Sequence, residues 1–136
     1  MRRRSRKVKV EKLTTLDQEE CAYALTCVDE VQKSGTAAKE YHTFAKRLPA
    51  MIVTCGLGQS LASLFSQTKS GDSVGKTMLL EHISKWLQEK RGIYSPGKMI
   101  LYPLMEGSLS SYIHAQEMTL RLLFWIRKLL DGLLEE

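Results

Sequence analysis

The chain has few residues that favour turns or extended structure. Among its 136 residues there are only three prolines and nine glycines, and segments rich in valine, isoleucine and threonine are hard to find. Because those residue types favour strands, a sheet has little support. Hydrophobic residues make up 43% and charged residues 26% of the chain, as in ordinary soluble globular proteins. The sequence therefore predicts an all-α fold, a compact bundle of about five to six helices.

Signs of secretion or membrane insertion are also missing. The three cysteines, Cys21, Cys27 and Cys55, form no CxxC pair, which is typical of reduced thiols in a cytoplasm. Residues 48–68 carry no charge, but their proline, glycines, glutamines and serines make this run too polar and too broken to span a bilayer. We therefore expect a cytoplasmic protein without a membrane partner.

Positive charge is concentrated at the N-terminus. Residues 1–12 carry seven basic side chains and one acidic one, a net charge of +6, whereas the other 124 residues carry 13 basic and 14 acidic side chains, a net charge of −1. So repulsive a segment cannot fold alone, and residues 1–13 are expected to form a disordered basic arm. The arm could bind nucleic acid through its phosphates, or it could be a solvated segment that aids solubility. Residues 14–136 are expected to form a single helical domain.

Capping and punctuation residues divide the domain into helices. Thr15 and Gln18 resemble a capping box at the start of a first helix that runs to about Lys33. Pro49 either breaks or kinks the second helix or opens the next one. The glycines at 56 and 58 predict a bend, and residues 91–108 are the least regular segment. Further helices are expected at 36–48, 59–67, 76–90 and about 111–134, and residues 50–55 are also expected to be helical.

The last of these helices has apolar residues on two faces. One stripe is sufficient for the core, and a second group surrounds Arg127 on the opposite side: Leu120, Leu123, Phe124, Leu130 and Leu134. Such a helix is either central to its domain or covers the core on one side and a partner on the other. In so small a domain the second interpretation is favoured, which makes Leu123, Phe124, Arg127 and Leu130 the predicted subunit-contact residues.

No motif for catalysis, metal binding or nucleotide binding has the required pattern. Residues 71–77 (GDSVGKT) imitate a phosphate-binding loop, but the spacing is one residue short and the loop follows a helix rather than a strand. The pairs Glu81–His82 and His114–Glu117 lack the order and spacing of a di-metal bundle and are expected to be surface polar residues. Cys55 and His42 have no local mark of a nucleophile pair, and Cys55 is expected to be buried. We expect no enzyme activity, no cofactor, no metal and no small-molecule substrate.

Basic residues of the helical domain suit contact with phosphate. Phosphate contacts depend on charge rather than on base sequence. Each such side chain alone could equally be a solvated surface charge. The candidates are Lys46, Arg47, Arg121, Arg127 and Lys128.

Several segments resemble the small α-helical subunit of the type III-B CRISPR effector, the Cmr complex. The resemblance rests first on residues 39–41 (KEY), 45–52 (AKRLPAMI) and 56–62 (GLGQSLA), which give a tyrosine, a basic pair before Leu-Pro, an apolar turn and a Gly-Leu-Gly-Gln bend. Residues 85–87 (KWL), Tyr112 and residues 122–128 (LLFWIRK) are similar to the later helices of that family. The similarity extends over about residues 14–134.

The resemblance implies a non-catalytic subunit of an RNA-guided, RNA-targeting complex in antiviral defence. Several copies would stack beside the backbone and large subunits and line the channel of the guide RNA–target RNA duplex. Basic groups would then follow phosphates while base pairing reads sequence. On this interpretation the RNA-binding residues are Lys46, Arg47, Arg121 and Lys128.

The alternative is a stand-alone helix-turn-helix-like DNA-binding protein with a basic arm. The bend at 56–58 between two helices is its best support. A recognition helix, however, carries base-reading side chains near its start, and residues 59–67 offer only Gln59 and Gln67, with no positive charge.

Overall fold

The computed structural model describes residues 14–69 and 73–134, so the predicted arm at 1–13 lies outside the described residues. Within those two ranges all regular structure is helical and no strand occurs, which confirms the all-α prediction. No helix there is both long and apolar enough to cross a membrane. A 3₁₀ turn (Gln67–Lys69) and a π-helical turn (Trp86–Lys90) extend two of the helices. The α-helices are α2 (Leu16–Lys33), α3 (Ala37–Cys55), α4 (Leu57–Ser66), α5 (Val74–Lys85), α6 (Leu101–Glu106) and α7 (Leu109–Leu134).

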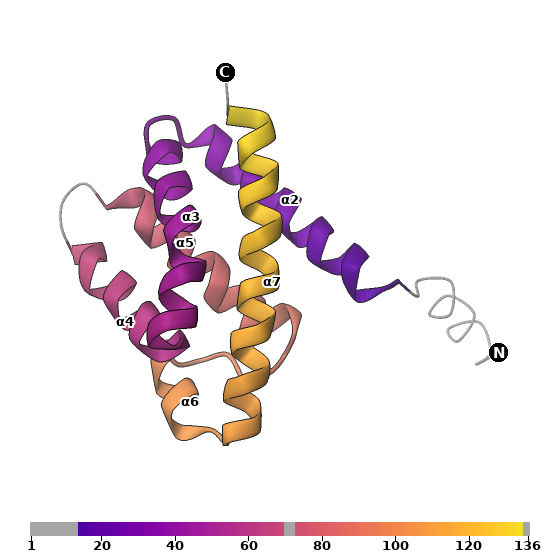
Figure 1. Cartoon of the computed structure of the whole chain (residues 1–136), viewed down its shortest axis with the longest axis vertical. Coiled ribbons are helices and arrows are strands. Elements are labelled where there is room, and N and C mark those ends of the chain that lie inside the picture. Colours follow the sequence, from indigo (N-terminus) through magenta and orange to yellow (C-terminus); the bar gives the residue numbers. More distant parts are fainter. Residues whose placement is uncertain (1–13, 70–72, 135–136) are drawn as a thin grey trace.

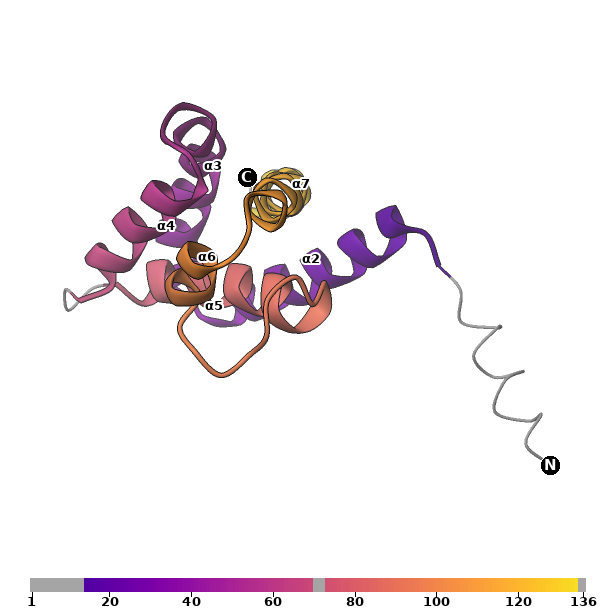
Figure 2. The same ribbon diagram turned by 90° about the horizontal axis from the view of Figure 1, so that it is seen from below.

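The long C-terminal helix α7 is the central element of the fold. It runs the length of the molecule with α3 beside it, while α2 crosses it on its other flank (Figure 1). Seen end-on, α7 lies between α3 and α2 (Figure 2). Most of both apolar stripes of α7, Leu123 and Leu130 included, is therefore covered within the chain and joins one continuous core, whereas Phe124 and Leu133 stay about half exposed. Of the two interpretations of this helix, the structure supports the central one.

The first helix begins as its sequence predicts. The Thr15 hydroxyl accepts a hydrogen bond from the backbone N–H of Gln18 (3.1 Å), and the Gln18 side chain accepts one from the backbone N–H of Thr15 (2.8 Å). These reciprocal bonds satisfy two backbone donors that a helix otherwise leaves unpaired at its start. The capping box of α2 is thereby confirmed.

Pro49 neither ends α3 nor opens a new helix, because α3 continues through it to Cys55. The ring removes one backbone donor, a loss that a helix tolerates when packing holds the flanking turns. Leu48 and Ile52, on either side of the proline, are both fully buried. The expected end of the second helix at about residue 48 is therefore wrong, and the chain turns instead at Gly56.

The bend between α3 and α4 depends on the conformation of Gly56. Its φ of 92° and ψ of 159° lie in a region that is essentially closed to other residues. Gly58, by contrast, lies within α4, and a Cβ added there would be 3.2 Å from the Tyr112 hydroxyl oxygen. That hydroxyl accepts a hydrogen bond from the Gly58 N–H (2.8 Å), and the Gln116 side chain accepts one from the Leu57 N–H (3.0 Å). Side chains of α7 thus fix the start of α4.

We expect Gly56→Val to lower the free energy of unfolding by about 1–3 kcal/mol, because valine is strained at this φ and ψ. The measurement is the urea midpoint of the full-length chain. Gly132→Ala is the matched control, since Gly132 is helical and a Cβ there meets nothing within 4 Å. An unchanged midpoint for Gly56→Val would show that the bend does not require this conformation.

Candidate nucleic-acid and subunit interfaces

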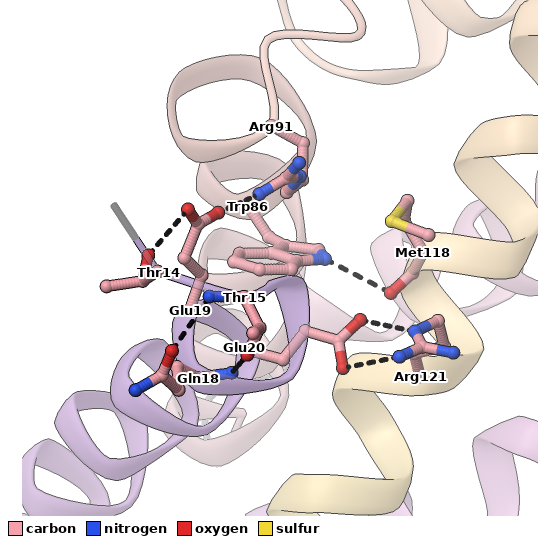
Figure 3. Close-up of polar contacts among 9 residues, drawn as sticks. All are labelled: Thr14, Thr15, Gln18, Glu19, Glu20, Trp86, Arg91, Met118 and Arg121. Carbon is pink, nitrogen blue, oxygen red and sulfur yellow. Dashed lines mark hydrogen bonds and ion pairs between the residues drawn. The ribbon is translucent and has the colours of Figure 1, made fainter. Parts of the chain in front are cut away.

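Arg121 on α7, a predicted RNA-binding residue, is held by a carboxylate of α2. Its guanidinium donates to both oxygens of Glu20, with the Nη2–Oε1 distance at 3.1 Å (Figure 3). Glu20 is only 1% exposed and also accepts from Trp125 Nε1 (3.1 Å). The hydrogen bond to Glu20, together with its charge, raises the pKa of Arg121. This arginine serves first as the counter-ion of a buried glutamate.

Lys128, the second predicted cation of α7, shares a shallow pocket of about 220 Å³ with Arg121. Asp17 and Glu20 line the same pocket, so two acidic groups balance the two basic ones. Lys128 itself is exposed and has no carboxylate partner in the described part of the chain. The α7 surface is therefore close to neutral around these residues.

The predicted pair Lys46 and Arg47 is exposed, but its two side chains leave α3 in different directions. Lys46 lies one turn after His42, whose Nε2 is 2.9 Å from Asp131 Oδ1 on α7. Arg47 lies toward α5, with its guanidinium carbon 5.6 Å from the centre of the Phe44 ring. Adjacent residues on a helix do not face the same way, so a phosphate held by one is not held by both.

Arg47 shares a pocket of about 410 Å³ with two lysines that sequence reasoning did not assign to binding. Lys39 comes from the first turn of α3 and Lys76 from the start of α5. The spacing of Lys39, Thr43 and Arg47, four residues apart on one helix face, is a sequence signal that could have found part of this pocket. The sequence could not predict that Lys76 lines this pocket, because α5 packs against α3 only in the folded chain.

The carboxylate of Glu40 occupies the N-terminus of α5 inside this pocket. Its Oε1 accepts from the backbone N–H of Gly75 (2.9 Å) and of Lys76 (3.3 Å), and Oε2 is 3.4 Å from Lys76 Nζ. An anion therefore already sits where a phosphate-binding loop would hold its phosphate. The cap comes from Glu40, whereas the hydroxyl of Ser73, the residue before α5, donates to the Thr68 carbonyl (2.7 Å).

Two of the four predicted subunit-contact residues are wrong. Leu123 and Leu130 are 0% exposed, because α2 and α3 cover α7 on both flanks. They cannot contact another subunit from within the core. Phe124 is 48% exposed and Arg127 is also exposed, so both remain predicted contacts.

Four large apolar side chains are exposed on α6 and the first turns of α7, which together form one end of the molecule (Figure 1). Tyr102 and Met105 are 59% and 61% exposed, three residues apart on α6. Leu109 and Ile113 are 75% and 58% exposed, four residues apart on α7. We call these four residues the apolar end. Sequence reasoning missed Tyr102 and Met105, because residues 91–108 have no regular periodicity.

The expected surface position of His82 is wrong. It is buried, with Nδ1 2.7 Å from the Tyr41 hydroxyl and Nε2 2.7 Å from Glu30 Oε1. Both ring nitrogens are thus engaged by the protein itself. Cys27 lies beside this cluster, and burial raises the pKa of its thiol to about 12. The thiol is therefore protonated near neutral pH and is a poor nucleophile.

The expected burial of Cys55 is wrong, because this cysteine is exposed, and it lies at the opposite end of α3 from His42. Thirteen residues of helix separate the two by about 20 Å, so they cannot form a nucleophile pair. Within residues 14–69 and 73–134, no three His, Cys, Asp or Glu side chains come together as metal ligands.

The structure does not support the alternative of a helix-turn-helix-like DNA-binding protein. The α4 helix that follows the bend has no basic residue, and its first turn is tied to α7 rather than free to enter a groove.

One comparison bears on the family of this chain. A family model described as CRISPR-associated protein (Cas_Cmr5) matches residues 16–133, which extends from the start of α2 to the last turn of α7. The match includes every described helix.

Proposed function

The chain belongs to the Cmr5 family of CRISPR-associated proteins and is a small subunit of the type III-B Cmr complex, and we propose that it acts there as a non-catalytic packing subunit. In this proposal the apolar end binds a neighbouring protein subunit, and basic side chains contact the guide RNA–target RNA duplex.

The observation that carries this proposal is the exposure of the apolar end. Each of its four large side chains has more than half of its surface in water. The spacing of three residues on α6 and of four on α7 places each pair on one helix face. Groups of exposed apolar side chains of this kind mark protein–protein contacts in soluble proteins. Membership of a multi-subunit complex supplies the partner, another protein subunit of that complex.

The RNA part of the proposal rests on the exposed cations. Lys46, Arg47 and Lys128 are free to meet phosphate, whereas Arg121 is engaged by Glu20 and contributes less. Contacts of this kind position a nucleic acid without reading its bases. They agree with a complex in which the guide reads the sequence by base pairing.

To test the packing role, the triple variant Met105→Ser/Leu109→Ser/Ile113→Ser is co-expressed with the other Cmr subunits. We expect it to fold normally, since these side chains are exposed, but to be absent from the purified complex because the interface no longer buries apolar surface. The measurement is the amount of this subunit per complex, with circular dichroism of the isolated variant as the check on folding.

Leu25→Ser/Val74→Ser is the matched control, because these two side chains are 49% and 59% exposed on other elements. It is expected to assemble as the unaltered chain does. Full incorporation of the triple variant would refute the packing role of the apolar end. A size shift of the unaltered chain alone, absent from the triple variant, would identify the neighbour as a second copy.

A further inference from the structure

Three cations from two helices surround the pocket that lies between α3 and α5. Lys39 and Arg47 come from α3 and Lys76 from α5, and Thr36 and Thr43 add two hydroxyl groups to the lining. The sole acidic residue of this lining is Glu40, which leaves a local net charge of +2. No comparable excess exists in the pocket of Arg121 and Lys128, where acids and bases balance.

The partners of the three cations show which of them are available. Lys76 is held by Glu40 at 3.4 Å, so its ammonium group is partly neutralised. Lys39 and Arg47 are exposed and have no carboxylate partner in the part of the chain that the structure describes. An incoming anion can therefore meet both without displacing a protein group.

Phe44 fixes the geometry of the pocket without offering a surface for stacking. Its ring is only 3% exposed, yet Arg47 and Lys76 lie 5.6 Å and 5.7 Å from its centre. Cations placed over an aromatic ring are held there by its negative face, which reduces the entropy cost of binding. Because the ring itself is covered, a base cannot stack on it.

The amide donors at the start of α5 are also unavailable to a ligand, since Glu40 accepts from Gly75 and Lys76. A terminal phosphate of a nucleotide needs such donors. A phosphodiester carries a single negative charge and is satisfied by one or two cations and a hydroxyl group. The pocket therefore fits a phosphodiester better than the terminal phosphate of a nucleotide.

We infer that the pocket of Lys39, Arg47 and Lys76 is a binding site for the phosphodiester backbone of RNA. This inference rests on the proposed function and makes it more specific, because it moves the main RNA-binding surface from the α7 cations to the space between α3 and α5. Binding there is independent of base sequence.

The test compares three double variants of the chain in the reconstituted Cmr complex. Lys39→Ala/Arg47→Ala removes two pocket cations and leaves the Glu40–Lys76 pair intact. Lys46→Ala/Lys128→Ala removes two cations outside the pocket. Lys85→Ala/Lys90→Ala is the matched control, with the same loss of charge on an exposed surface of α5 and the π-helical turn. Target-RNA affinity is measured at several salt concentrations.

For the pocket variant we expect normal assembly and a slope of log affinity against log salt that is lower by about 1.4, roughly 0.7 for each phosphate that the protein no longer neutralises. At about 0.1 M salt this corresponds to an affinity about 25-fold weaker. The control is expected to change neither quantity.

Each other outcome is decisive. An unchanged slope for the pocket variant, with a reduced slope for Lys46→Ala/Lys128→Ala, would overturn the pocket and leave RNA contact in place. Unchanged slopes for all variants would overturn RNA contact by these residues as well. Loss of assembly would show that the pocket binds protein.

Discussion

Trp86→Ala is expected to lower the free energy of unfolding by about 3–5 kcal/mol, the usual cost of deleting a large buried aromatic side chain. The indole is 1% exposed and stacks on Tyr23 of α2, with ring centres 5.1 Å apart and an angle of 17° between the rings. Its Nε1 donates to the Met118 carbonyl of α7 (3.1 Å), as Figure 3 shows. One side chain thus joins the end of α5 to both α2 and α7.

Urea denaturation of the full-length chain measures this effect, and Trp86→Phe is the matched variant. Phenylalanine keeps the aromatic ring but removes the indole N–H and part of the volume, so we expect a smaller loss than with alanine. A loss below about 1 kcal/mol for Trp86→Ala would mean that the surrounding helices do not depend on this ring.

Arg121→Gln is expected to cost about 2–4 kcal/mol, because it leaves the Glu20 carboxylate buried without its counter-ion. Breaking a buried ion pair from one side costs about 3–5 kcal/mol, and the arginine side chain here is 41% exposed, which lowers the expected figure. Trp125 would remain as a hydrogen-bond donor to Glu20, but an indole carries no charge.

The double variant Glu20→Gln/Arg121→Gln tests this explanation. Removing the buried charge together with its counter-ion should restore part of the stability, so the double variant should unfold at a higher urea concentration than Arg121→Gln alone. Additive losses would show that the buried charge is not the cause. A weaker RNA interaction of any Arg121 variant must be compared with its loss of stability before it is assigned to phosphate contact.

The sequence predicted the helices well where the structure depends on residues that are close together along the chain. The Thr15–Gln18 capping box and the glycine at position 56 both act within one turn of the chain. The prediction that the second helix ends before Pro49 was wrong, because the packing of Leu48 and Ile52 outweighs the loss of one backbone donor. The short helix α6 was not predicted because its six residues make fewer than two turns, too few for a periodic pattern.

The candidate site was harder to predict because it depends on which helices meet. Periodicity showed that α7 has two apolar faces, but it cannot say whether a helix of the same chain or of a partner covers each face, and so Leu123 and Leu130 were misassigned. Lys76 reaches Arg47 only through the packing of α5 on α3. Arg121 was expected to meet solvent, since nothing near it in sequence reveals Glu20, 101 residues away.

In the proposed function, the chain binds a neighbouring subunit of the Cmr complex through its apolar end. Hydrogen exchange tests it most directly, by comparing the isolated full-length chain with the same chain in the reconstituted complex. Among the first backbone amides of α7, Ser111 N–H donates to the Ser108 hydroxyl and Tyr112 N–H to the Ser108 carbonyl. These bonds lie at an exposed helix end, so they open readily until a neighbour covers them. We predict slower exchange in the complex across residues 101–113. Unchanged exchange there, with protection confined to other helices, would contradict the claim.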